Sequence, residues 1–290
     1  MIEADLRREG AKSMTETVFV CPHCGQLLRK KEDARALVCP IGHSYDVSRE
    51  GYVNLLLRMT RSAHGDNREM LLARRAFLEG GYYAPLASAA GKLLCARLED
   101  GARILDAGCG EGYYTEAIAE AMRTAGKRAE LFGVDISREA VRLCAKRACA
   151  PVTAVASLYE LPIADGSFDA LVCFFSPQSD AEFRRVLKDG GYLLMAVPDA
   201  RHLYGMKRVL YDTPYENEVK DPYIEGFRLI DEVGVSDVIT LRLPSDIAAL
   251  FSMTPYYYRT PRKGHARLSA LDTLETEIAF RLFLYEKPAE

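Results

Sequence analysis

Residues 104–112 read Ile-Leu-Asp-Ala-Gly-Cys-Gly-Glu-Gly, and this stretch decides the fold. Apolar residues of this kind form a buried strand, and the glycines then allow a sharp turn into a helix. Gly108, Gly110 and Gly112 carry no Cβ, so a ligand can lie directly against the main chain. Leu131-Phe132-Gly133-Val134-Asp135 reads as a second strand ending in an acid that can hold the hydroxyls of a ribose. Together these segments predict a nucleoside-binding site.

The charges around this turn indicate which nucleoside is bound. A dinucleotide site usually has the spacing G-x-G-x-x-G and seats a pyrophosphate on the helix N-terminus. Here the spacing is Gly-x-Gly-x-Gly, and Asp106 and Glu111 place two acids at the turn. They would repel a pyrophosphate but suit a cationic ligand such as S-adenosylmethionine. The pattern resembles motif I of class I methyltransferases, and Asp135 resembles their ribose-binding acid; the alternative is an ordinary glycine-rich turn.

Composition sets the broad class of the protein. The 290 residues are 49% apolar and 27% charged, as in ordinary globular proteins, and suffice for one large domain plus a small one. We find no long apolar run typical of a membrane span and no signal peptide, so we expect a cytoplasmic protein without membrane contact. The formal net charge of −3 neither announces nor excludes a nucleic-acid partner. Residues 1–17 read as a polar extension.

The N-terminal module, residues 18–57, has the spacing of a zinc ribbon. Cys21-Pro22-His23-Cys24 is a C-x-x-C knuckle, and Cys39-Pro40-Ile41-Gly42-His43 supplies a second pair. Two clusters of soft or borderline ligands fit tetrahedral zinc, so we predict Cys21, Cys24, Cys39 and His43 as the ligands. His23 competes for the fourth place, and a loop of free thiols is the alternative. Four protein ligands close the site, which makes it structural and not catalytic.

A basic segment follows the ribbon and opens a stretch of linker and helices over residues 58–100. Its cationic side chains are Arg58, Arg61, His64, Arg68, Arg74 and Arg75. We interpret them as a surface for RNA phosphates, against the alternative of a solvated helix face. Two further basic clusters are Lys207-Arg208, and Arg259, Arg262, Lys263, His265 and Arg267 after Tyr256-Tyr257-Tyr258. Aromatic beside basic residues suit single-stranded RNA, and the alternative is that the tyrosines close the core.

Residues 101–290 alternate strand and helix patterns. We expect helices over 113–123 and 138–147 and strands over 152–156, 168–175 and 192–197, with a turn at Lys188-Asp189-Gly190-Gly191. This alternation predicts an α/β fold with a doubly wound, Rossmann-like sheet, and the class I resemblance adds an antiparallel hairpin that includes residues 277–285. Ser176-Pro177-Gln178, after the fourth strand, is the candidate target-base loop: Ser176 and Gln178 would bond a guanine edge and Phe175 would stack on it. A plain strand-to-helix turn is the alternative.

Several strings occur in one order: Arg49-Glu50-Gly51-Tyr52-Val53-Asn54-Leu55-Leu56, then Ala73-Arg74-Arg75-Ala76-Phe77-Leu78, then Gly108-Cys109-Gly110-Glu111-Gly112-Tyr113-Tyr114-Thr115. With the ribbon, they closely resemble the bacterial 23S rRNA (guanine-N1)-methyltransferases. The resemblance implies methylation of a guanine in a hairpin loop of 23S ribosomal RNA, a homodimer, and cofactor contacts from Tyr83, Ser157 and His202. The alternatives are that Tyr83 is a half-buried core aromatic and that His202 is a histidine of a surface loop. Two subgroups of the family modify neighbouring guanines, and one protects the ribosome from macrolides such as tylosin.

Two other functions compete with this reading. A methyltransferase of small molecules would share the glycine turn, but the ribbon and the arginine clusters speak against it. A non-catalytic RNA-binding module on a decayed enzyme core is disfavoured by the intact Asp106, Gly108, Gly110 and Asp135. Guanine N1 carries a proton that must leave, and Glu111, Asp180 and Asp199 are acids near the predicted site. No pattern marks any of them as a general base.

Overall fold

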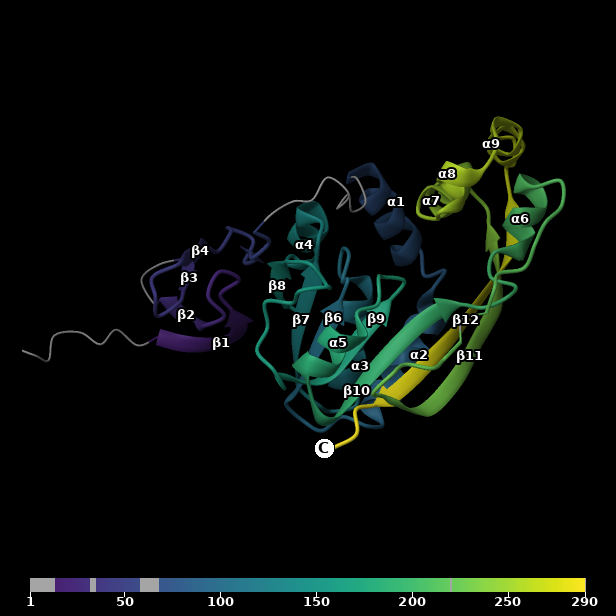
Figure 1. Ribbon diagram of the computed structural model, residues 1–290. Coiled ribbons are helices and arrows are strands. Elements are labelled where there is room, and N and C mark those ends of the chain that lie inside the picture. The colour runs from purple at the N-terminus through teal and green to yellow at the C-terminus, as the bar shows by residue number, and fades with distance from the viewer. Residues whose placement is uncertain (1–13, 32–34, 58–67, 220, 290) are drawn as a thin grey trace, which may run out of the picture.

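The computed structural model describes residues 14–31, 35–57, 68–219 and 221–289. The N-terminal part is a small antiparallel sheet in the order β1-β2-β3-β4, seen on the left of Figure 1. Its strands are β1 (Met14–Val20), β2 (Leu27–Lys31), β3 (Ala36–Val38) and β4 (Ser44–Asp46). Strand β1 thus begins inside the segment that we predicted as a polar extension.

The large domain is an eight-stranded sheet in the order β11-β12-β10-β9-β6-β7-β8-β5. Six strands run parallel to one another: β5 (Val53–Asn54), β8 (Val152–Val155), β7 (Ala129–Asp135), β6 (Ala102–Ala107), β9 (Phe168–Phe174) and β10 (Leu187–Pro198). Strands β11 (Arg228–Leu241) and β12 (Leu274–Glu286) form the expected antiparallel hairpin beside β10. The predicted doubly wound fold is confirmed.

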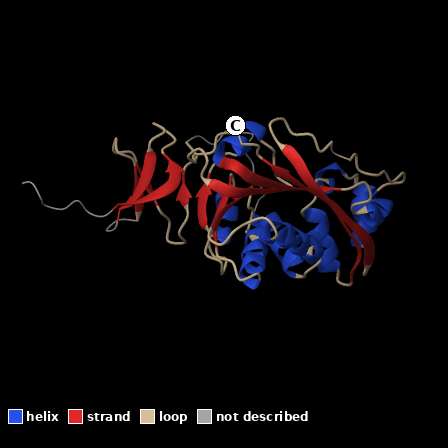
Figure 2. Ribbon diagram, turned by 90° about the horizontal axis from the view of Figure 1, so that it is seen from below, coloured by secondary structure: helices blue, strands red, loops and turns tan. Residues whose placement is uncertain are grey.

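Helices cover both faces of the sheet (Figure 2). One set follows the alternation of strand and helix, and a second set, α6 to α9, gathers beyond the upper ends of β11 and β12 (Figure 1). The bounds are α1 (Arg68–Glu79), α2 (Ala84–Cys95), α3 (Tyr113–Thr124), α4 (Arg138–Cys144), α5 (Asp180–Val186), α6 (Tyr204–Leu210), α7 (Pro244–Ser252), α8 (Tyr256–Arg259) and α9 (Arg262–Ser269). No helix in the described ranges is both long enough and apolar enough to cross a bilayer.

Alternating side chains of the parallel strands divide the core into two layers. Ile104 and Val172 face α2 and α3, whereas Leu105 and Leu171 face α5 on the other side. Because both faces are buried, these strands read as continuous apolar runs, which is why they were recognisable in the sequence. The carboxyl ends of β6, β7, β8 and β9 meet at one edge, where doubly wound sheets bind ligands.

The small sheet is docked on the large domain. Val20 N–H donates to Pro162 O at 2.9 Å, and Ala164 N–H donates to Val18 O at 2.9 Å. Phe19, between these two contacts, is almost fully buried in the layer that also contains Leu105 and α5. The two parts therefore share one hydrophobic layer instead of being joined by a linker alone.

Two expectations about local structure were wrong. The turn predicted at Lys188–Gly191 lies inside β10, where the pairing with β9 shifts between Leu187 and Tyr192. A positive φ of 74° at Gly190 accommodates the irregularity without ending the strand. Helix α4 ends at Cys144, three residues before the predicted end, and Ser137 caps its start by accepting a hydrogen bond from Ala140 N–H.

Candidate donor site and zinc centre

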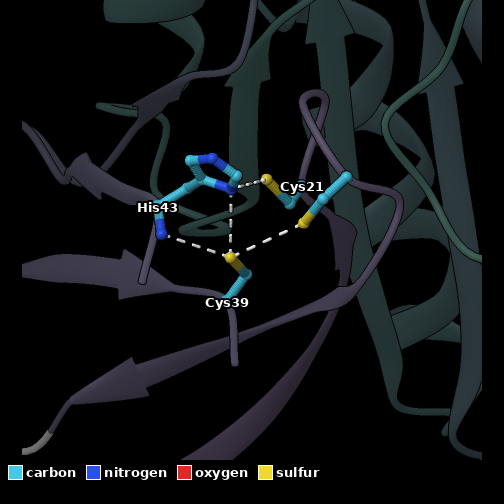
Figure 3. Close-up of side chains that lie close together, drawn as sticks. Cys21, Cys39 and His43 are labelled. Atoms are coloured by element: carbon cyan, nitrogen blue, oxygen red, sulfur yellow. Dashed lines mark hydrogen bonds between the residues drawn. The ribbon is translucent and has the colours of Figure 1, made fainter. Parts of the chain in front are cut away.

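The ribbon brings the four predicted zinc ligands together (Figure 3). Sγ of Cys21 and Sγ of Cys39 each lie 3.4 Å from Nδ1 of His43, and Sγ of Cys24 lies 3.6 Å from that of Cys39. A tetrahedral ion with Zn–S near 2.3 Å and Zn–N near 2.05 Å requires S···S of about 3.8 Å and S···N of about 3.5 Å. The cluster fits zinc closely, with His43 as the ligand. The ring of His23 lies beside that of His43, with centroids 5.1 Å apart.

Local hydrogen bonds prepare this centre for a cation. The knuckles turn at Gly25 and Gly42, which have φ of +70° and +98°, and His43 N–H donates to Cys39 Sγ at 3.3 Å. The Tyr45 hydroxyl donates to Cys21 Sγ at 3.1 Å. Burial alone would raise the pKa of the Cys21 thiol, but this bond and the backbone amides of the knuckle lower it to about 6. A thiolate is the form that binds zinc.

The three glycines of the turn between β6 and α3 have different surroundings. A Cβ at Gly108 would lie 2.3 Å from Ser176 Cβ, and one at Gly112 would lie 2.8 Å from Cys144 Sγ. A Cβ at Gly110 would meet no heavy atom of the described residues within 4 Å. We expected all three glycines to bare the main chain for a ligand. At Gly108 and Gly112, side chains of the protein occupy the space that a Cβ would take. At Gly110 that space is free of described atoms.

Asp135 lies directly beside Gly110. Its carboxylate accepts hydrogen bonds from Gly110 N–H at 3.0 Å and from Ser137 N–H at 2.8 Å. These two bonds fix the acid at the carboxyl end of β7, half-buried, next to the open glycine. This is the position that a ribose-binding acid requires in a doubly wound sheet.

The other two acids of the turn are engaged within the protein. Asp106 is buried and accepts a hydrogen bond from Thr115 Oγ1 at 2.5 Å, and burial raises its pKa to about 7. Glu111 is 2% exposed and forms an ion pair with Arg147, whose Nε also donates to Glu111 O at 3.0 Å. Both side chains are therefore buried and bonded inside the protein, and the suitability of these two acids for a cationic ligand stays a prediction.

Tyr83 and His202 meet although they are far apart in sequence. Ala279 N–H donates to Nδ1 of His202 at 3.2 Å, so the ring proton sits on Nε2, which donates to the Tyr83 hydroxyl at 3.3 Å. Burial lowers the pKa of His202 to about 3, and burial also raises the pKa of Tyr83. A neutral histidine therefore orients a protonated tyrosine. His202 is buried, which excludes the reading of a surface loop histidine.

The loop after β9 is strained at one residue. Phe175 has φ of +59°, which is unfavourable for a residue with a Cβ, yet its side chain is 49% exposed. Its ring lies near those of Phe280 and Tyr114, with centroids 5.5 and 6.3 Å away. Backbone strain that holds a large aromatic ring partly in solvent is typical of a ligand-contacting residue.

The polar residues of this loop point to protein partners. Ser176 Oγ donates to Ala107 O at 2.7 Å and packs against Gly108, and the Gln178 amide donates to Asp180. Pro177 lies between them. As placed, Ser176 fastens the loop to the glycine turn and does not face an open base site. The other two candidate acids also have partners inside the protein. Asp180 accepts the hydrogen bond from the Gln178 amide, and Asp199 forms an ion pair with Arg281, with 3.1 Å between Oδ1 and Nε.

Basic residues divide into buried and exposed sets. Lys207, a member of the first later basic cluster, is fully buried: its ammonium donates to Tyr215 O at 3.0 Å and to Asn217 Oδ1 at 2.6 Å. Arg267 is held by Asp212 and Leu210 O. Exposed aromatic and basic side chains gather instead on α8 and α9: Tyr257, Tyr258, Arg259, Arg262 and Lys263. Arg58, Arg61 and His64 lie outside the described residues.

Three residues with clear roles in the site had escaped the sequence analysis. Arg147 neutralises Glu111, Thr115 bonds Asp106, and Phe280 packs against His202 with ring centroids 4.5 Å apart. Thr115 lies on the first turn of α3 and was quoted within a family string, but nothing in the sequence paired it with Asp106. Arg147 and Phe280 carry no local signal, because their partners are distant along the chain.

Family models match both parts of the chain. A model described as "Methyltransferase domain" matches residues 104–191, which begin in β6 and end within β10. A model described as "RlmA, N-terminal" matches residues 19–57, which contain all four residues of the Cys/His cluster.

Curated relatives match over most of the chain. A protein of Micromonospora griseorubida is 35% identical over 91% of this chain and 96% of its own, and one of Bacillus subtilis (strain 168) is 32% identical over 90% and 94%. Both carry, provisionally, the name 23S rRNA (guanine-N1)-methyltransferase. A 23S rRNA (guanine(748)-N(1))-methyltransferase of Streptomyces fradiae is 38% identical over 63% of this chain and 64% of its own.

Proposed function

Because the chain belongs to the family of 23S rRNA (guanine-N1)-methyltransferases, we propose that it transfers a methyl group from S-adenosylmethionine to N1 of a guanine in 23S ribosomal RNA. The observation that carries the proposal is the open main chain at Gly110, beside Asp135, at the carboxyl edge of the sheet. The strained, half-exposed Phe175 belongs to the loop that packs against the same turn through Ser176.

The residues around the turn fit the chemistry of this donor. S-adenosylmethionine supplies a methyl group already activated by a positively charged sulfur. Asp135 would accept hydrogen bonds from the ribose hydroxyls, and Gly110 would let the donor approach the backbone. The Tyr83 hydroxyl accepts from His202, so its own proton is available to a carboxylate of the donor. The main task of the protein is alignment, because positioning the reacting atoms can supply much of the rate.

The target guanine has to leave its stack so that N1 becomes accessible. Phe175 offers an aromatic surface for it, since stacking on aromatic side chains is the common way to hold a splayed-out base. Glu111, Asp180 and Asp199 are each paired inside the protein, with Arg147, Gln178 and Arg281. We therefore assign none of these carboxylates as the acceptor of the N1 proton.

The RNA surface that we propose comprises the ribbon and the exposed residues of α8 and α9. Tyr257 and Tyr258 beside Arg259, Arg262 and Lys263 combine stacking with phosphate contact. A hairpin loop of 23S RNA as the target, the cytoplasm as the location and a homodimer as the assembly belong to this proposal through the family resemblance.

The test is methylation of RNA in vitro. Methyl-labelled S-adenosylmethionine is incubated with 23S RNA transcripts, and the modified nucleotide is mapped by reverse transcription, which stops at N1-methylguanine because the pairing edge is blocked. We expect one strong stop at a guanine in a hairpin loop. Label that enters small molecules but no RNA would contradict the proposal, and so would failure to bind S-adenosylmethionine.

A matched pair of variants tests the role of Phe175. Removing one base-stacking ring costs about 1–3 kcal/mol, so Phe175→Ala should lower kcat/KM for RNA by roughly 5- to 150-fold without changing the affinity for S-adenosylmethionine. Tyr223→Ala removes another exposed ring, from the loop before β11, and should leave both quantities unchanged. Equal effects of the two substitutions would contradict the assignment of Phe175.

A further inference from the structure

A cavity of about 770 Å³ lies between the zinc ribbon and the carboxyl ends of β7 and β8. One wall is the first zinc knuckle, including Cys21, Pro22 and His23. The opposite wall includes Ile136 and Ser157, which follow β7 and β8. Leu55, Leu56 and Leu57, directly after β5, also line the cavity, which is partly open to solvent. The cavity is thus built jointly by the ribbon and the methyltransferase sheet.

Its position continues the donor site. Ile136 is the next residue after Asp135, the acid proposed to hold the ribose, and the Asp135 carboxylate bonds Gly110. A nucleoside whose ribose lies on Asp135 can extend its base toward Ile136. That direction leads into the cavity, which Ile136 lines and whose volume lies within the roughly 300–1,000 Å³ typical of small-molecule sites. Its leucine, isoleucine and proline walls suit a flat heteroaromatic ring.

We propose that the first zinc knuckle and Leu55–Leu57 form part of the adenine pocket, so that zinc in the ribbon and S-adenosylmethionine in the sheet stabilise each other's binding. This inference rests on the proposed function, because it takes S-adenosylmethionine as the donor. It gives the ribbon a role in holding the donor, in addition to any contact with RNA.

The knuckle is held firmly enough to act as a wall. Val18 and Val20 form backbone hydrogen bonds of 2.9 Å with Ala164 and Pro162, on the segment that follows Ser157. Phe19, between them, pairs with Ile163 and is buried. The strand that leads into Cys21 is thus joined to the loop that forms the opposite side of the cavity.

Zinc would couple to the donor through Cys21, which is both a zinc ligand and a lining residue. Cys21 O accepts hydrogen bonds from Cys24 N–H at 3.2 Å and from Gly25 N–H at 2.8 Å, which close the knuckle around the metal position. Without zinc, the metal no longer fixes the position of Cys21, and the knuckle that lines the cavity becomes less constrained. Coupling between the binding free energies of two ligands is reciprocal, so bound donor must also raise the affinity of the ribbon for zinc.

Two bulky substitutions in the full-length, zinc-loaded protein test the wall. Leu56→Trp adds a large ring to the cavity, whereas Ile41→Trp adds the same ring at a 67% exposed position on the second knuckle, away from the cavity lining. Affinity for S-adenosylhomocysteine is measured by calorimetry, with zinc content and thermal unfolding as controls. We expect Leu56→Trp to raise the Kd at least tenfold and Ile41→Trp to change it less than twofold.

The reciprocal arm uses the wild-type protein and a chromogenic chelator. Saturating S-adenosylhomocysteine should lower the zinc Kd, measured by competition with the chelator at equilibrium, at least fivefold. An unchanged Kd for S-adenosylhomocysteine in Leu56→Trp with zinc retained, or a zinc Kd that is the same with and without S-adenosylhomocysteine, would overturn the inference. A cavity that instead accepts an RNA base would leave the donor affinity intact and raise KM for RNA, which also overturns it. If the wild type bound no donor at all, the proposed function would fail and not this wall alone.

Discussion

Arg147 offers the sharpest test of how the donor turn is held. Its side chain is 7% exposed and forms ion pairs with Glu111, with Glu116 at 2.9 Å and with Glu79 at 3.2 Å. Arg147→Met keeps most of the packing volume but leaves the buried Glu111 carboxylate without its cation. Breaking a buried ion pair on one side costs about 3–5 kcal/mol, which is roughly a 5–8 °C fall in Tm for a chain of 290 residues.

The pH dependence of this loss has a definite sign. Burial raises the pKa of Glu111 in the folded protein, and removing Arg147 raises it further. The folded variant then binds a proton more tightly than the unfolded chain, whose glutamate pKa is about 4.3. The loss in free energy of unfolding relative to wild type is therefore small below about pH 4.3, and it grows as the pH rises through the pKa of Glu111 in the folded variant. Urea denaturation at several pH values between 5 and 8 measures it.

Two further variants decide the interpretation. Arg128→Met removes an arginine whose side chain is 86% exposed and pairs with Asp100, and it should leave stability near the wild-type value. Glu111→Gln with Arg147→Met removes the stranded charge and should recover at least half of the loss. The reasoning is refuted if Arg147→Met costs no more than Arg128→Met, or if the double variant is no more stable than Arg147→Met alone.

Three more outcomes are expected. Gly110→Ala and Gly126→Ala both place a Cβ at positive φ in space free of described atoms, and each should lower the free energy of unfolding by about 1–2 kcal/mol. Only Gly110→Ala should also weaken S-adenosylmethionine binding in calorimetry, by tenfold or more. Equal weakening in both variants would contradict the site. Because the pKa of His202 is lowered to about 3 in the folded protein, the unfolded chain binds a proton on this residue more readily than the folded one. The free energy of unfolding should therefore fall by up to about 1.4 kcal/mol for each pH unit below pH 6.5. His202→Asn should reduce this slope, measured by urea titrations at several pH values. Cys39→Ser should lose bound zinc and ribbon stability, measured by metal analysis and thermal unfolding, whereas Cys95→Ser should keep its zinc; retained zinc in Cys39→Ser would show that the ligand set is wrong.

The sequence predicted those features that depend on short stretches of chain. The glycine turn, the apolar strands and the Cys/His spacing each carry their signal within a few residues, because backbone sterics and metal geometry act locally. The parallel arrangement of the strands was predicted from their alternation with helices, whereas their order in the sheet was not. Tyr83 and His202 came from the family resemblance, and the structure brings their side chains together.

The side-chain partners could not be predicted in the same way. No residue near Gly108 in the sequence indicates that Ser176 occupies the space where a Cβ of Gly108 would lie. That contact depends on the register between β6 and β9. Lys207 looked like a surface cation, yet Asn217 and two tyrosine rings enclose it. Burial of a polar residue depends on packing between distant segments, which residue spacing does not describe.

The two-residue strand β5 has a practical consequence for anyone who wishes to study the catalytic half alone. It pairs in parallel with β8, and Leu55 N–H donates to Val155 O at 3.0 Å. Strand β5 is therefore the edge strand of the large sheet and covers the backbone of β8. A truncated chain that begins after residue 57 would expose the backbone of β8, and bare strand rims invite intermolecular pairing. Such a fragment should self-associate, and inclusion of residues 52–57 should restore monodisperse behaviour in light scattering.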